Sequence, residues 1–540
     1  MIEFDHKLPS LNIDGTHNGT YNNYEMVLPC ALTTDSSRLG IFMHLLHNAV
    51  ADERRLVFVD GKVLGCSNNW IRDHVHMMKA FRHWEHDLKS FLQYIIDTQT
   101  DEGYFYELIK QLDDPHWEFV DESCRVLFPE DNVALVRLEL EADIEYLVVE
   151  GAWQYYRATG DFEWVKKVLP RLEKAIDYMT SSPKRWNKEY GLVVRPFTID
   201  TWDFTNDPRS QTDRRIHDDE PMSAMHGDNS GVYEAMTILA EFNDKAGNAE
   251  KAAEWRRRAE TLKKNMMRYL WNGKYFIHML HINHSGIDDK ESERLSLSNG
   301  YDINRGVTDL NQSRSIIEEY MERRKTTKAF AEWFSIDPPY ENFKGFKPGW
   351  YVNGSISPFT AGEIALASFK NGYEDYGWDI ISRFIEISEK DKMICFLYSP
   401  LDKGAQNGSG PSGWGAAALL NAVDEGLAGV VDRDCLYREI DFSPRFVVCP
   451  HREMRYITGY EAAQKFVDVR YVLKDEGMRY DVYSSAEKIN FHVLLPKGKT
   501  CAKLLVDGRE HEFKTAAVGG SAYVDFSYAP HGKVSTEILF

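Results

Sequence analysis

Residues 232–270, VYEAMTILAEFNDKAGNAEKAAEWRRRAETLKKNMMRYL, decide the fold class because they read as two helices joined by a glycine turn. In the second helix, apolar residues recur at steps of three or four, at Ala252, Trp255, Ala259, Leu262, Met266 and Leu270. This spacing places them on one stripe of an α-helix. In the turn Ala246-Gly-Asn248, glycine can end one helix and a polar residue can begin the next. The stretch therefore predicts a helical hairpin.

The same pattern, a glycine that ends one helix and a polar residue that begins the next, occurs at Ala158-Thr-Gly-Asp161 and at Asn371-Gly-Tyr-Glu374. Longer segments rich in Trp, Asp, Gly and Pro separate these hairpins. Helical hairpins in series, with loops of this kind between them, favour a closed ring of paired helices whose loops meet at one end. We therefore predict a mainly α fold, with a toroid of helices over residues 36–444.

After Pro444 the pattern changes to alternation, in which Ile489, Phe491, Val493 and Leu495 are separated by polar residues. Val506-Asp-Gly508 has the composition of a hairpin turn, and residues 466–473 read as another strand. These features predict a small antiparallel β-sandwich domain over residues 445–540. Residues 1–35 are expected to form an N-terminal arm.

Bulk composition limits the possible partners and compartments. The 540 residues exceed one ordinary hydrophobic core, and the formal net charge of −20 disfavours a nucleic acid or an anionic membrane as a partner. Seven scattered cysteines without a CxxC pair indicate neither a disulfide framework nor a zinc ribbon. No leader pattern or long apolar run is present, so we expect a cytoplasmic protein.

The stretch Arg195-Pro-Phe-Thr-Ile-Asp-Thr-Trp-Asp-Phe-Thr-Asn-Asp207 places three carboxylates and an indole in an expected loop. A sugar ring needs an aromatic surface for its apolar C–H face, and cleavage of a glycosidic bond needs a protonated carboxyl beside the leaving oxygen. Asp203 with Trp202 can meet both needs, and Asp200 can bind a hydroxyl. The alternative is that both aspartates are helix caps and Trp202 is a core residue.

Thr201-Trp-Asp-Phe-Thr205 resembles the Gly-Trp-Asp-Phe-Ser segment of trehalases, in which the Asp after Trp is the general acid. It is also similar to the Asp-x-Trp-Glu segment of glucoamylases. Asp228-Asn229 and the helix after it resemble the Asp-Leu-Asn helix of trehalases and of glycoside hydrolase family 63. The resemblance implies that Asp203 is a general acid in an inverting-type glycoside hydrolase.

Three further motifs extend this resemblance over roughly residues 60–445. Trp70-Ile-Arg-Asp73 is similar to the Trp-x-Arg-Asp of glucoamylases and debranching enzymes, where Arg and Asp hold hydroxyls of the sugar at the cleaved bond. Trp350-Tyr-Val-Asn-Gly354 resembles the Tyr-x-Asn-Gly-x-x-Trp loop, and residues 413–419 resemble the Gly-Trp-Ser-Ala-Ala-x-Leu helix. Together the motifs imply an (α/α)6 barrel. The resemblance implies that Arg72 and Asp73 bind the sugar. Trp70 and Asn353 are further candidates for sugar binding, and Trp350 and Trp414 either stack on sugar rings or belong to the core, with Trp350 favoured for stacking.

One departure from the family concerns the general base. In family 63 a Glu-x-Tyr-x-Pro segment carries it, whereas this chain has Phe396-Leu-Tyr-Ser-Pro400. Either another carboxylate is the base, with Asp402, Glu363 and Glu341 as candidates, or phosphate is the nucleophile, or hydrolysis has been lost. We favour the first explanation, with Asp402 as the first candidate because it lies in a glycine-rich loop.

Two further groups of polar residues are candidates for binding a ligand or a metal. Met225-His-Gly-Asp-Asn-Ser230 precedes a helix, so His226, Asp228 and Asn229 either bind sugar hydroxyls or cap the helix. His74, His76, His83 and His86 lie close in sequence but lack an HExxH pattern, so we predict no metal. No cofactor is expected.

The sequence thus predicts a glycoside hydrolase that acts on a small oligosaccharide or glycoside. The alternatives are a carbohydrate phosphorylase, an epimerase or lyase that uses His226 and His74 for proton transfer, and a sugar-binding protein that has lost catalysis. Linkage, anomeric configuration and oligomeric state are not encoded in any motif.

Overall fold

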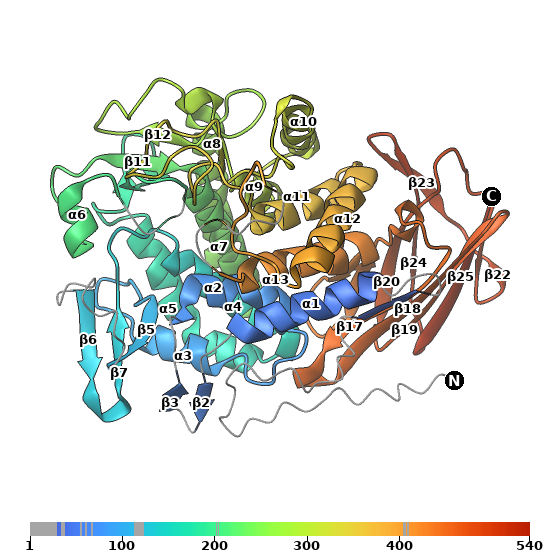
Figure 1. Ribbon diagram of the computed structural model, residues 1–540. Coiled ribbons are helices and arrows are strands. Elements are labelled where there is room, and N and C mark those ends of the chain that lie inside the picture. The colour runs from blue at the N-terminus through green and yellow to red at the C-terminus, as the bar shows by residue number, and fades with distance from the viewer. Residues whose placement is uncertain are drawn as a thin grey trace.

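The computed structural model describes residues 30–33, 38–53, 57–59, 62–65, 69–112, 124–200, 202, 205–402, 407 and 410–540 (Figure 1). The α-helices in these residues are α1 (Arg38–Glu53), α2 (Ile71–Phe81), α3 (Ser90–Asp97), α4 (Ile144–Thr159), α5 (Phe162–Met179), α6 (Pro208–Asp213), α7 (His226–Lys245), α8 (Ala249–Tyr269), α9 (Asn299–Asn304), α10 (Leu310–Thr326), α11 (Pro358–Lys370), α12 (Glu374–Asp391) and α13 (Gly413–Asn421). A π-helical turn, Ala422–Ala428, extends α13.

The three predicted helical hairpins are confirmed. α4 ends at a left-handed Gly160, and the side chain of Asp161 caps α5 by accepting a hydrogen bond from the Trp164 N–H at 3.1 Å. Helices α7 and α8 are joined through Gly247, and α11 and α12 through Gly372, both with positive φ. The apolar stripe of α8 is buried as predicted. Local sequence alone specifies these hairpins, because each helix end has its own turn residue.

Six helices contact one another in a closed order, α2–α4–α7–α9–α11–α13, and α13 contacts α2 again. We call this set the helical ring. The other long helices pack on its outside, with α1 against α13, α3 and α5 against α4, α8 against α7, α10 against α11 and α12 against α11. Ring and outer helices therefore alternate along the chain, as expected when each hairpin adds one helix to each layer.

Short strands lie among the helices. They are β2 (Val57–Val59), β3 (Lys62–Gly65), β4 (Asn69–Trp70), β5 (Leu108–Gln111), β6 (Arg125–Phe128), β7 (Val133–Val136), β8 (Trp186–Asn187), β9 (Leu192–Val193), β10 (Arg195–Pro196), β11 (Met222–Met225), β12 (Met279–His281), β13 (Leu295–Ser296) and β14 (Ile336–Asp337). Strands β4 and β11 lead directly into α2 and α7, and β13 precedes α9. These strands fix where the ring helices begin.

The remaining strands form two sheets at one end of the molecule (Figure 1). They are β1 (Cys30–Thr33), β15 (Val430–Asp432), β16 (Glu439–Phe442), β17 (Glu453–Tyr460), β18 (Lys465–Lys474), β19 (Gly477–Ser484), β20 (Lys488–Leu494), β21 (Lys503–Val506), β22 (Arg509–Glu510), β23 (Lys514–Val518), β24 (Ser521–Tyr528) and β25 (Lys533–Leu539). Their orders are β1-β17-β18-β19-β25-β21-β22 and β15-β16-β20-β24-β23. Phe442 of the second sheet packs on Tyr480 of the first, with ring centroids 5.8 Å apart.

The mainly helical fold with a C-terminal β region is confirmed, and three details of the sequence prediction differ. The β region begins at Val430, not at residue 445, because β15 and β16 share a sheet with β20. The sheets are not purely antiparallel, since β16 pairs with β20 in parallel. Part of the expected N-terminal arm, Cys30–Thr33, is a strand that pairs with β17. Among the described residues, no helix has both the length and the apolar character needed to cross a membrane.

Candidate functional site at the helix starts

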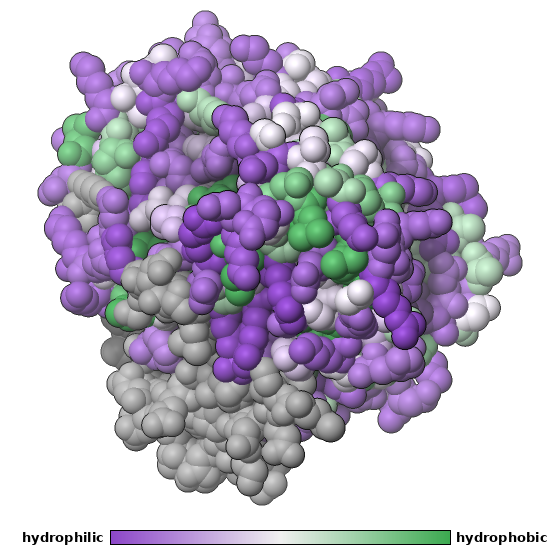
Figure 2. All heavy atoms as spheres, turned by 90° about the vertical axis from the view of Figure 1, so that its right-hand side faces the viewer, coloured by the Kyte–Doolittle hydropathy of each residue, from purple (hydrophilic) through white to green (hydrophobic). Residues whose placement is uncertain are grey.

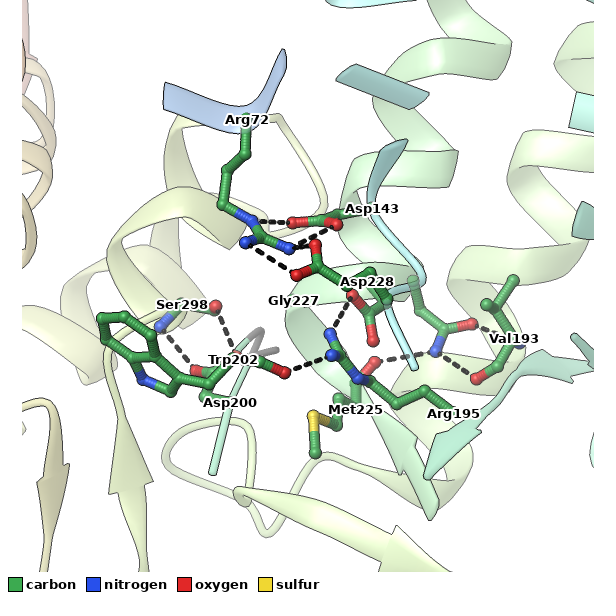
Figure 3. A network of polar contacts seen from close by, with 12 residues as sticks. Arg72, Asp143, Val193, Arg195, Asp200, Trp202, Met225, Gly227, Asp228 and Ser298 are labelled. Carbon is green, nitrogen blue, oxygen red and sulfur yellow. Dashed lines mark hydrogen bonds and ion pairs between the residues drawn. The ribbon is translucent and has the colours of Figure 1, made fainter. Parts of the chain in front are cut away.

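Several ring helices begin at one polar cluster. Arg72 stands in the first turn of α2, and its guanidinium donates to Asp143 Oδ1 at 2.8 Å and to Glu141 Oε1 at 3.3 Å (Figure 3). Asp143 is the residue before α4, and Asp73 lies half-buried beside Arg72 in α2. Trp70 packs against a small separate core cluster that contains Leu108. The predicted Arg-Asp motif therefore reaches the ring, whereas the Trp70 indole is used for packing.

Asp228 and Arg195 form a second pair in this cluster. Arg195 Nη1 lies 3.6 Å from Asp228 Oδ1, and both side chains are fully buried (Figure 3). Among the described residues, neither carboxylate oxygen of Asp228 has a hydrogen-bond partner. Burial raises the pKa of Asp228 to about 6, and the charge of Arg195 opposes this shift. A buried acceptor without a donor is costly, so the pair is poised to bind a ligand or water.

Asp200, another predicted sugar ligand, is fully engaged by the protein. Its carboxylate accepts hydrogen bonds from the Ser298 N–H at 3.1 Å and from the Ser298 hydroxyl at 2.9 Å. Its own N–H donates to His278 Nε2 at 3.0 Å. Gly227 makes this approach possible, because a Cβ there would lie 2.3 Å from Ser298 Oγ. Asp200 therefore holds Ser298, the residue before α9, and His278, the residue before β12.

His226 and Asn229 also make structural contacts. The His226 ring lies between Asp302 Oδ2, at 2.5 Å, and Ser296 Oγ, at 2.7 Å. Burial lowers the pKa of this imidazole, but Asp302, together with the charges of Asp200 and Asp228, outweighs that effect and the pKa is raised. The Asn229 amide exchanges hydrogen bonds with both backbone groups of Val193, at 2.8 and 3.0 Å. Neither side chain is free to bind a sugar in this arrangement.

A narrow pocket opens in the ring beside this polar cluster. It is lined by His76, Asp143, Tyr146, Leu297, Ser298, Tyr301, Arg305 and Trp414. The Trp414 indole stacks on the His76 ring, with centroids 4.3 Å apart and an interplanar angle of 4°, and its N–H donates to the Tyr301 hydroxyl at 2.7 Å. Of the described residues, none hydrogen-bonds His76 Nδ1. The pocket thus offers an aromatic wall and an unused polar atom.

Trp202 lies close to the position at which the family base was expected. Its ring contacts Tyr351 and Phe396, each with centroids 5.5 Å away. Phe396 also contacts Phe359, which stacks on Trp414. Asp203 lies outside the described residues, although its neighbour Trp202 is described. Phe396 therefore belongs to the same aromatic cluster as Trp202, where it presents a phenyl ring and no carboxylate.

The three base candidates do not line the pocket. Glu363 is buried in α11, where it pairs with Lys79 at 2.7 Å and accepts a hydrogen bond from Asn304 at 2.6 Å. Asp402 and Glu341 are exposed in loops. The expectation that Asp402 faces a binding site gains no support from any contact in the described residues, and Glu363 serves as an ion-pair partner within the helical ring.

In the loop of Trp350 and Asn353, one side chain holds the loop and the other is exposed. The Asn353 amide donates to the carbonyl groups of Tyr340 and Phe346, both at 2.8 Å, and so holds the loop. The Trp350 side chain is 54% exposed and remains available for stacking.

The four histidines predicted not to bind metal have separate protein neighbours; His86, for example, contacts Glu461 at 3.0 Å. In the described part of the chain, no three His, Cys, Asp or Glu residues form a group suited to a metal ion.

Sequence reasoning missed several residues of the site. Asp143, Tyr146, Tyr301 and Arg305 line the pocket but belong to no motif. Arg305 follows α9, pairs with Glu234 at 3.2 Å and donates to the Gly227 carbonyl at 2.9 Å. Arg195 opens the stretch that contains Asp203, but nothing local predicts its pairing with Asp228. These residues converge only when the ring closes.

Residues 228–333 match the family model described as trehalase. The matched segment begins at Asp228, the third residue of α7, and extends through α8, α9 and α10, so the predicted resemblance to trehalase-like glycoside hydrolases is confirmed in this part of the chain. Among curated proteins, none matches in sequence.

Solved structures of glycoside-cleaving proteins share the fold. The α-L-rhamnosidase from Dictyoglumus thermophilum superposes with a TM-score of 0.57 at 12% identity, over 94% of this chain and 50% of that one. A GH78 family rhamnosidase of Bacillus sp. GL1 superposes with a TM-score of 0.57 at 13% identity. The match covers 86% of this chain and 42% of that one. A protein described as a sialidase superposes with a TM-score of 0.56 at 13% identity. The match covers 92% of this chain and 41% of that one. The chain spans half or less of the length of each, and identities this low establish a common fold alone.

Proposed function

We propose that this chain cleaves a glycosidic bond in a small oligosaccharide or glycoside. The closed order of six ring helices inside six outer ones supports an (α/α)6 barrel, and the two facing sheets support a β-sandwich. We further propose a cytoplasmic protein, in keeping with the free thiols of Cys124, Cys395, Cys435, Cys449 and Cys501.

One observation carries this proposal: the buried Asp228 carboxylate has no hydrogen-bond donor among the described residues, and it faces Arg195 next to an aromatic pocket. Sugar hydroxyls are donors that a carboxylate accepts, and an indole face suits the C–H face of the ring. The exposed indole of Trp350 would supply such a face, whereas Trp414 already stacks on both His76 and Phe359. Arg72 and Asp143, already paired, would orient the hydroxyls at the cleaved bond.

The general acid is proposed to be Asp203, on the strength of the trehalase-like segment around Trp202. For the base we now favour Asp228 over Asp402, Glu363 and Glu341. A base works best when its pKa lies near the working pH, and the pKa of Asp228 is raised to about 6. Its oxygens are unengaged among the described residues, unlike those of Asp200.

Phosphorolysis is the second candidate, because Phe396 stands where a base was expected and a phosphorylase needs none. Arginines near the pocket would suit phosphate, but each already faces a carboxylate: Arg72 faces Asp143, Arg195 faces Asp228, and Arg305 faces Glu234. This charge balance favours a neutral sugar and water over a phosphate dianion.

Proton transfer by histidine, as an epimerase or lyase would require, is less well supported. His226 is enclosed by Asp302 and Ser296, and His74 packs edge-on against Phe81 and Phe91. Neither ring lines the pocket. A sugar-binding protein without catalysis would bind the same ligands but release no product.

The test is a screen of the purified chain against α- and β-linked disaccharides and aryl glycosides, with and without phosphate. Asp203→Asn is assayed in parallel, and Asp402→Asn serves as a matched control on an exposed aspartate. We expect sugar release that is independent of phosphate, lost in Asp203→Asn and kept in Asp402→Asn. Release that requires phosphate would establish the phosphorylase instead, and equal activity of wild type and Asp203→Asn would refute the assignment of the acid.

A further inference from the structure

An open cleft of about 750 Å³ lies in the C-terminal β region, well away from the helical ring. Its walls come from β16, β20 and β24 and from the segment before β23, all at the end of the molecule opposite α6 (Figure 1). No lining residue belongs to the candidate site. The volume falls within the range of small-molecule binding pockets, which is about 300–1,000 Å³.

Strand register gathers polar side chains in this cleft. His492 of β20 is directly opposite Asp525 of β24, and Asn490 is opposite both Ser527 of β24 and Asp441 of β16. Residues two apart on a strand point to the same face, so these side chains form a continuous polar ladder across three strands.

Hydrogen bonds within the ladder hold its acceptors in place. The Asn490 amide donates to Asp441 Oδ1 at 2.9 Å and accepts from the Ser527 hydroxyl at 2.9 Å. His492 Nδ1 lies 2.6 Å from Asp525 Oδ1, and the imidazole stacks on Tyr523 with centroids 3.8 Å apart. A carboxylate can accept about four hydrogen bonds, so Asp441 and Asp525 retain capacity for hydroxyl donors.

The cleft also has an apolar side and a defined charge. Its apolar side is the half-buried Phe513, because the rings of Phe491 and Phe526 alternate with the polar ladder and are buried in the core. Among its lining residues, the carboxylates Asp441, Glu512 and Asp525 outnumber the single ammonium of Lys514. This balance disfavours anions. The surface at this end is mostly hydrophilic, with an apolar patch near the centre of the view (Figure 2).

We propose that this cleft is a second binding site and that its ligand is a neutral oligosaccharide. Fixed carboxylate, amide and imidazole groups would hydrogen-bond the sugar hydroxyls, while Phe513 provides apolar contact for the ring. The inference does not depend on hydrolysis in the helical ring, since binding at the cleft is measurable in a chain without activity.

The experiment is hydrogen–deuterium exchange of the full chain, with and without millimolar maltotriose, cellotriose or mannotriose. Peptides that cover β20 and β24 report on the cleft, and peptides that cover α7 and α9 report on the ring. We compare wild type with the double variant Asp441→Asn/Asp525→Asn, which keeps side-chain shape. The control is Asp475→Asn, an exposed aspartate in the turn between β18 and β19.

At least one trisaccharide is expected to protect β20 and β24 in the wild type and in Asp475→Asn. In the double variant the affinity at these strands should fall about tenfold or more, because hydrogen bonds to charged acceptors are lost. Glycosidase activity should be unchanged in both variants. Absence of protection with all three sugars, or equal protection in the double variant, would overturn the proposal whatever the result of the hydrolysis assay.

Discussion

Asp200 and Asp228 are both fully buried near the start of α7, yet their surroundings differ in kind. Asp200 accepts two hydrogen bonds from Ser298, so its charge is compensated by the fold itself. Asp228 has Arg195 at 3.6 Å and no hydrogen bond among the described residues. Buried polar groups in proteins are nearly always satisfied, so an unsatisfied one marks a place where a ligand completes the structure. The first aspartate builds the site, and the second is left available for chemistry.

The largest effect should come from Asp228→Asn. If Asp228 accepts a proton from water, the amide cannot do so, and kcat should fall by about 10²–10⁴-fold. The variant should remain folded because the amide has nearly the same shape. Steady-state kinetics together with a circular dichroism spectrum provide the measurement, and a fall of less than threefold would argue against a catalytic or binding role.

Asp200→Ala should show the opposite profile. Truncation leaves the N–H and the hydroxyl of Ser298 without their acceptor, and we expect a loss of about 3 kcal/mol in the free energy of unfolding. Urea denaturation measures this loss. Ser298→Ala, which removes one of the two hydrogen bonds, is the graded control at about 1 kcal/mol. A fully stable Asp200→Ala would show that Asp200 does not build the site.

Stability against pH should distinguish the two aspartates further. The pKa of Asp228 is raised above its ordinary value to about 6, so the folded state binds this proton more tightly than the unfolded state. The resulting stability is present below about pH 4 and is lost as the pH rises to about 6, by up to about 3 kcal/mol. Asp228→Asn should therefore be more stable than wild type at pH 8, with the difference vanishing near pH 4. Parallel stability curves would contradict this view of Asp228.

Gly227→Ala should cost less. The added Cβ would meet Ser298 Oγ at 2.3 Å and Asp200 Oδ1 at 3.1 Å, so Ser298 must shift. We expect a destabilisation of about 2 kcal/mol. Combining the change with Ser298→Gly, which removes the obstructing hydroxyl, should recover part of it. Thermal unfolding of the single and double variants gives the comparison, and additivity of the two changes would exclude the steric explanation.

Local sequence predicted the helical hairpins and the strand around Phe491 because each depends on residues a few positions apart. Glycine turns end α4, α7 and α11, and alternation buries Ile489, Phe491 and Val493 in β20. Sequence periodicity carries no information on the parallel pairing of β16 with β20, which joins segments about fifty residues apart. The start of the β region was therefore placed too late.

The candidate site was predictable only where a motif marked it. Arg72, Asp228 and Trp414 were found through the resemblance, whereas Asp143, Tyr146 and Arg305 enter the pocket from other helices without a signal of their own. Asn229 and Asn353 show the opposite case. The motifs predicted that both amides bind sugar, but both donate hydrogen bonds to backbone carbonyl groups. Only tertiary contacts tell a satisfied amide from an available one.

The most direct test of the central claim is a crystal structure of Asp203→Asn soaked with the disaccharide that the wild type cleaves. The account predicts a sugar in the helical ring, with hydroxyl oxygens within hydrogen-bond distance of the Asp228 carboxylate and the Arg195 guanidinium. A sugar bound elsewhere, with Asp228 still facing Arg195 alone, would contradict it.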